Sequence, residues 1–191
     1  LGGHYTLGVS ETVDDQGNKK KSETTRNWDF LNRADYSLTS NKSLYSQILI
    51  EGDKFSGFNQ RDNYGFGALF KHIHTDKITF ESELGYRYSV ERLTSKNADG
   101  KDLTYTNKAR VFLKYARTPK ENIKMDFWVE YLRDFSDKDD YIINFSPSLS
   151  LTMTSMFALK LSYKGTYDNA PAVKGNEYLD YQYTTSLIMN Y

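Results

Sequence analysis

The sequence of 191 residues predicts an all-β fold, a transmembrane antiparallel up-and-down β-barrel of about ten strands. Apolar and polar residues alternate with a period of two over nearly the whole chain, short turns alternate with longer polar loops, and the last alternating segment ends on an aromatic residue, Tyr191. Because successive side chains of a strand point to opposite faces, each segment would have one apolar and one polar face. We expect one domain, residues 1–191.

The composition narrows the classes of protein and of partner. Lys plus Arg equals Asp plus Glu at 25 each, so net charge gives no reason to expect nucleic acid as a partner. Cysteine is absent, which excludes disulfides and thiolate metal sites. The mean hydropathy of −0.70 argues against a conventional membrane helix, which needs roughly 20 mainly apolar residues. Even the uncharged residues 141–159 alternate Ser and Thr with Leu, Phe and Met.

The first four predicted strands alternate imperfectly, whereas the next two are cleaner. The first four are residues 1–9, 28–38, 44–50 and 64–70, with apolar positions such as Tyr5, Tyr36, Ile48 and Phe66. In residues 78–91, a face with Phe80, Leu84 and Tyr86 opposes Glu81, Glu83 and Arg87. In residues 108–115, Val111 and Leu113 oppose Arg110 and Lys114. Alternation over four to eight residues is typical of a half-buried strand.

The last four predicted strands carry the clearest pattern. They are residues 123–131, 141–151, 157–168 and 180–191. In the first of them Met125, Phe127 and Val129 oppose Lys124, Asp126 and Glu130; in the third, Leu159, Leu161 and Tyr163 oppose Lys160, Ser162 and Lys164. In the last strand only Ile188 breaks the alternation.

The connections fall into two alternating classes. Short turns are expected at residues 40–42, 75–77, 118–122 and 154–155, and longer polar loops at 13–21, 55–62, 94–102, 136–140 and 169–178. Bacterial outer-membrane barrels combine short periplasmic turns, longer outer loops and an even strand number. This pattern predicts that both termini are periplasmic.

Alternation alone leaves open which face is enclosed, because a soluble lipocalin-type barrel would put the apolar face inside. Both signs of charge on the polar face favour an enclosed polar lumen, since neighbouring acidic and basic strands can pair. The predicted lumen network is Arg33, Glu51, Glu81, Glu83, Arg87, Arg110, Lys114, Asp126, Glu130, Lys160 and Lys164. Tyrosines near strand ends on the apolar face are typical of the aromatic girdles of membrane barrels.

The C-terminal strand indicates the cellular location and the partners. Leu187, Met189 and Tyr191 resemble the assembly signal of outer-membrane proteins. We therefore expect the bacterial outer membrane as location, with membrane lipid, lipopolysaccharide and the barrel-assembly machinery as partners. Docking to another outer-membrane protein is a further expectation.

Three blocks of the sequence resemble the salt-induced outer-membrane protein family, the YdiY-like proteins. The strongest match is residues 156–191, with LKLSYKGTYDNAP followed by a Thr-bearing terminal strand; residues 61–92 and 35–54 resemble two earlier hairpins of the family. The segment Glu11-Thr12 and DDQGNKKK departs from the family pattern. The resemblance implies an envelope barrel with a structural or stress-related role and carries over no catalytic residues.

The sequence shows no catalytic, cofactor or metal site. Among the three histidines, His4, His72 and His74, none is expected beside a serine and an acid, and His72 with His74 lacks a third metal ligand. The acidic runs Asp14-Asp15 and DKDD at residues 137–140 are expected to be solvated loop tips, with Ca²⁺ binding as the alternative. We expect a barrel without enzymatic activity, a narrow pore or a lipid-modifying enzyme being the alternatives.

Overall fold

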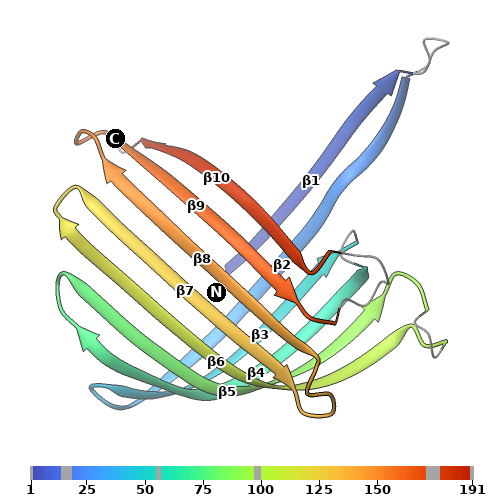
Figure 1. Ribbon diagram of the computed structural model, residues 1–191, viewed down its shortest axis with the longest axis horizontal. Helices are drawn as coiled ribbons and strands as arrows, with labels where there is room; N and C mark the ends of the chain where they lie inside the picture. The colour runs from blue at the N-terminus through green and yellow to red at the C-terminus, as the bar shows by residue number, and fades with distance from the viewer. Residues whose placement is uncertain (1, 14–18, 55–56, 97–99, 171–176, 190–191) are drawn as a thin grey trace. The chain divides into compact units, whose positions relative to one another are not determined.

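The computed structural model describes residues 2–13, 19–54, 57–96, 100–170 and 177–189, without the side chains of residues 4, 6–13 and 19–25. It contains ten strands (Figure 1), namely β1 (Gly2–Val13), β2 (Lys19–Thr39), β3 (Lys42–Asp53), β4 (Phe58–His74), β5 (Ile78–Leu93), β6 (Leu103–Lys120), β7 (Ile123–Asp134), β8 (Tyr141–Thr152), β9 (Phe157–Asp168) and β10 (Leu179–Met189). Among these residues no helix is long and apolar enough to cross a membrane. The predicted all-β fold is confirmed.

The strands form one sheet in sequence order, β1 to β10, in which neighbouring strands are antiparallel. β7 pairs with β8 through Glu130 opposite Asn144, and β9 pairs with β10 through Lys160 opposite Ser186. Neighbouring strands joined in sequence order make an up-and-down sheet, so the predicted topology and strand number are confirmed.

Several strands are longer than the sequence pattern predicts. β2 begins at Lys19, although residues 13–21 were expected to form a loop, and β4 begins at Phe58 inside the expected loop 55–62. β6 runs from Leu103 to Lys120, well beyond residues 108–115. The extension of β2 is polar and lacks an alternating apolar face, but backbone pairing does not require one. Residues 14–18, 55–56, 97–99 and 171–176 of the expected loops lie outside the described residues.

The chain packs as two compact units built from interleaved segments. Unit 1 contains residues Leu1–Ala34, Ser46–Gly65 and Arg87–Thr106, and unit 2 contains Asp35–Tyr45, Phe66–Tyr86 and Asn107–Tyr191. Strands β2 to β6 contribute residues to both units, and a single domain over residues 1–191 stays a prediction.

Unit 2 buries charged side chains and exposes apolar ones. Glu83 is 4% exposed, Arg110 5% and Glu130 8%, whereas Leu84 is 54% exposed and Phe127 42%. Charged residues are almost never buried in a soluble domain unless they are paired. The faces of these strands are therefore inverted relative to a soluble protein with an apolar core.

One aromatic ring lies across the polar face of unit 2 because two glycines make room for it. A Cβ added to Gly67 would lie 2.8 Å from the Tyr45 hydroxyl oxygen, and one added to Gly85 would lie 2.7 Å from the Phe66 carbonyl oxygen and closer still to the Tyr45 hydroxyl. Contacts under about 3.0 Å force a shift of backbone or ring. Gly67 and Gly85 thus allow Tyr45, on β3, to extend over β4 and β5.

We predict that Gly85→Ala lowers the free energy of unfolding by about 1–3 kcal/mol, because the new methyl group displaces the Tyr45 ring. Gly2→Ala is the matched control, since nothing lies within 4 Å of a Cβ at Gly2. Urea unfolding followed by tryptophan fluorescence measures both. Equal stability of the two variants would contradict the packing of Tyr45 over Gly85.

Candidate functional site

Three charged side chains from neighbouring strands meet at the centre of the polar face of unit 2. The Arg110 guanidinium on β6 donates one hydrogen bond to Glu83 on β5, at 2.5 Å, and another to Glu130 on β7, at 2.6 Å. All three side chains are buried. Removing one partner of a buried ion pair leaves an uncompensated charge and costs about 3–5 kcal/mol.

Uncharged groups extend this cluster in both directions along the sheet. Arg110 also donates to the Tyr45 hydroxyl at 2.9 Å, which reaches it from β3. On the other side, the Asn144 amide on β8 donates to Glu130 at 3.1 Å, and the Thr166 hydroxyl on β9 donates to Asn144 at 2.9 Å. The result is a continuous polar network, called here the Arg110 network, that contains side chains from β3, β5, β6, β7, β8 and β9.

Two aromatic rings lie beside the Arg110 network on the same face. The Arg110 guanidinium carbon is 5.0 Å from the Phe112 ring centroid, which is a cation–π distance. Phe112 in turn stacks on Trp128, with 6.0 Å between the two ring centroids. Phe112 packs against the guanidinium and leaves its N–H donors to Glu83, Glu130 and Tyr45.

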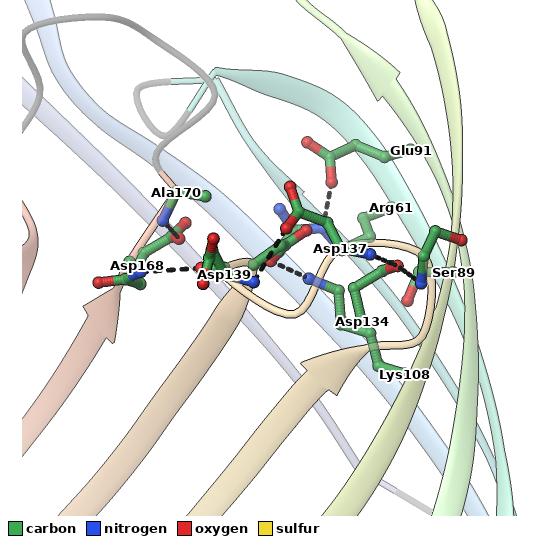
Figure 2. A network of polar contacts seen from close by, with 12 residues as sticks. Arg61, Ser89, Glu91, Lys108, Asp134, Asp137, Asp139, Asp168 and Ala170 are labelled. Atoms are coloured by element: carbon green, nitrogen blue, oxygen red, sulfur yellow. Dashed lines mark hydrogen bonds and ion pairs between the residues drawn. The ribbon is translucent and has the colours of Figure 1, made fainter.

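Unit 1 contains a second, more exposed charge cluster. Arg61 pairs with Glu91 at 2.8 Å, which Figure 2 shows, and with Glu51 at 3.6 Å. The Asn63 amide donates to Glu51 at 2.9 Å, and the Ser89 hydroxyl donates to Asn63 at 2.7 Å. The Arg61 guanidinium also lies 4.0 Å from the centroid of the Phe58 ring.

The structure brings some of the predicted lumen residues together and separates others. Glu81 and Lys114 approach to 3.9 Å, as their neighbouring strands predict, but Asp126 pairs with Lys124 of its own strand at 3.4 Å instead of with a basic residue of β6. Lys160 and Lys164, on β9, form no hydrogen bond or ion pair with the described residues of the Arg110 network. Arg33 is half-buried on β2, and Arg87 is buried on β5.

The assembly signal proposed from the sequence lies only partly within the described residues. Leu187 and Met189 lie on β10 and are 65% and 55% exposed. Tyr191 lies outside the described residues.

The acidic loop between β7 and β8 uses its carboxylates to hold its own backbone (Figure 2). Asp134 accepts hydrogen bonds from the amides of Ser136 and Asp137, and Asp137 accepts one from Asp139. Asp140 pairs with Lys108 at 2.8 Å. Among the described residues no three His, Cys, Asp or Glu side chains group as metal ligands would.

One of the three histidines lies beside a serine. The Nε2 of His72 is 2.7 Å from the Ser82 hydroxyl oxygen across the β4–β5 hairpin, a contact that the sequence alone does not indicate. The pair is on the apolar face, with the Phe80 ring 5.0 Å from the His72 ring. A serine nucleophile also needs an acid that orients the histidine, and in the described part of the chain no carboxylate bonds to His72.

The aromatic members of the site were not predicted from the sequence. Tyr45, Phe112 and Trp128 each lie at a polar-face position, where a large ring looks like a break in the alternation. Their position in the alternation could have identified them. Phe112 lies two residues from both Arg110 and Lys114, and Trp128 lies two residues from both Asp126 and Glu130, so each ring shares a face with charged residues.

Two comparisons place this geometry among known proteins. The chain is 26% identical to the uncharacterized protein YdiY of Escherichia coli (strain K12) over 157 residues, which is 81% of this chain. It spans only 58% of the length of that relative. The solved structure of the NanC porin in a rhombohedral crystal form matches with a TM-score of 0.58 over 99% of this chain and 94% of the other, at 11% identity, so this likeness concerns the fold alone.

The family model of proteins of unknown function, DUF481, matches residues 5–191. Together with the YdiY relative, this match confirms the resemblance to YdiY-like proteins that the C-terminal, central and early hairpins indicate. The porin-like antiparallel sheet agrees with the fold expected of that resemblance. The chain belongs to the DUF481 family, whose function is undefined.

Proposed function

We propose that this protein is an integral β-barrel of the bacterial outer membrane, with a mostly charge-filled lumen and with a structural or stress-related role rather than an enzymatic one. Both termini would be periplasmic. The observation that carries the proposal is the inverted burial of unit 2, with Glu83 and Arg110 buried and Leu84 and Phe127 exposed.

An exposed apolar face of this kind needs a covering, and lipid supplies one. The side chains that are large, apolar and exposed on β6 to β10 include Val111, Leu113, Tyr115, Met125, Phe127, Leu161, Tyr181, Tyr183 and Leu187. Water would make contact with all of them in a soluble monomer, and contiguous exposed apolar patches of that extent are rare on soluble proteins. In a bilayer the same residues would form the outward-facing apolar band of a barrel.

The Arg110 network supports a filled lumen. Long side chains occupy most of the interior of a barrel of eight to ten strands. Arg110, Glu83 and Glu130 are linked directly, and Tyr45, Asn144 and Thr166 extend the chain of hydrogen bonds. Each of the three charges of the network therefore has a partner of opposite sign.

The proposed location implies the partners. Outer-membrane lipid and lipopolysaccharide would surround the apolar face, and the barrel-assembly machinery would insert the chain through its C-terminal strand. Docking to another outer-membrane protein stays a prediction.

The filled lumen predicts that the purified protein forms no large, stable conductance in a planar bilayer. A variant combining Glu83→Ser, Arg110→Ser and Glu130→Ser removes the three directly linked charges at the centre of the network, and should raise the mean conductance at least about tenfold.

The control for this experiment is Val111→Ala, which changes an exposed apolar side chain next to Arg110. Circular dichroism would establish that the triple variant retains its strands. A large conductance of the unaltered protein, or a folded triple variant as silent as Val111→Ala, would contradict the filled lumen.

The His72–Ser82 pair is where a lipid-modifying activity would be expected first, because it lies on the proposed lipid face. The pair should support no hydrolysis of lipid, because His72 has no acid partner among the described residues. We predict that the purified protein releases fatty acid from phospholipid or lipopolysaccharide no faster than Ser82→Ala does. Hydrolysis that Ser82→Ala and His72→Ala both abolish would show an enzyme instead.

A further inference from the structure

A polar pocket lies on the same face of unit 2 as the Arg110 network, over strands β6 to β10. Its volume is about 440 Å³, within the range of small-molecule sites. The charged residues that line it are four lysines and one aspartate, Lys114, Lys124, Lys160, Lys164 and Asp126. The remaining polar lining is hydroxyl and amide groups, with Trp128 as an aromatic wall.

The four lysines differ in whether they have a counterion. Lys124 pairs with Asp126 at 3.4 Å and Lys114 approaches Glu81 at 3.9 Å. Within the described residues, Lys160 and Lys164 lie within 4.0 Å of no carboxylate.

The pairing of β9 explains why these two lysines have no counterion. Lys160 lies opposite Ser150 on β8 and Ser186 on β10, and Lys164 lies opposite Gln182 on β10. Ser162, between them, faces Ser148 and Thr184. These cross-strand partners are uncharged hydrogen-bonding groups, in contrast to Arg110, which bonds to a glutamate on each adjacent strand.

Both lysines also point to the same side of the sheet. They are four residues apart, an even spacing that puts their side chains on one face, about 13 Å apart along the strand. Lys160 is half-buried, which makes an absent counterion more costly than it is at a fully solvated lysine.

We propose that this pocket binds a small organic anion. Lys160 and Lys164 would contact the anionic group, the serine, threonine and glutamine side chains would bond to ligand hydroxyls, and Trp128 would pack against the ligand's carbon skeleton. Charge-assisted hydrogen bonds from lysine are stronger than those between neutral groups, so the anion supplies most of the affinity. The proposal goes beyond the proposed function and is independent of the membrane location, because every lining residue belongs to unit 2.

Isothermal titration calorimetry on the full chain tests this proposal, with D-glucuronate, its neutral counterpart D-glucose and inorganic phosphate as probes. We expect glucuronate to bind, phosphate to bind more weakly because it cannot use Trp128, and glucose to give no measurable binding. The double variant Lys160→Gln/Lys164→Gln should weaken glucuronate binding by about tenfold or more.

The matched control is Lys120→Gln/Lys138→Gln, which removes the same charge from two exposed lysines outside the pocket. This control should bind glucuronate as the unaltered protein does. Equal weakening in both double variants would show a general charge effect and overturn the site. So would equal binding of glucose and glucuronate, phosphate binding as tight as glucuronate binding, or no binding of any probe.

Discussion

The pairing of Arg110 with Glu83 and Glu130 is the interaction on which the inverted face of this sheet depends. A guanidinium that is 5% exposed has lost most of its hydration, and the two carboxylates on the adjacent strands, together with the Tyr45 hydroxyl, restore its hydrogen bonds. The Arg110 network then fixes the identity of its neighbours. Gly67 and Gly85 must be small so that Tyr45 can reach Arg110, and Asn144 must occupy the position opposite Glu130.

The same network divides the polar face of unit 2 into two regions with different chemistry. Over β5 to β7, Arg110 has a carboxylate on each side of it, and the charges in this part of the face neutralise one another as ion pairs. Over β8 to β10 serine, threonine and glutamine take the place of the carboxylates, and Lys160 and Lys164 have no counterion among the described residues. Removal of a single charge should therefore cost most in the first region, and the second region is the one that we propose binds an anion.

The sequence predicted the strands best where one face is continuously apolar. The bounds of β7 to β10 differ from their predictions by few residues, because alternation and half-burial coincide there. β2 begins nine residues earlier than expected because KKKSETTRN has no apolar face, although its backbone pairs with β1. Glu83, Arg110 and Glu130 were predicted to pair, since acidic and basic strands alternate. Tyr45 and Trp128 were not predicted as members of the site, because an aromatic ring on the polar face is recognised only once the strand register is known.

The central claim is that the apolar face contacts lipid and the polar face does not. Because the chain has no cysteine, single-cysteine variants carry a fluorescent label at one position only. Leu113→Cys and Lys114→Cys are adjacent on β6 and point to opposite faces. In liposomes, brominated lipid should quench the label at position 113 and aqueous iodide the label at position 114. The reverse pattern, or iodide quenching at both positions, would contradict the membrane barrel.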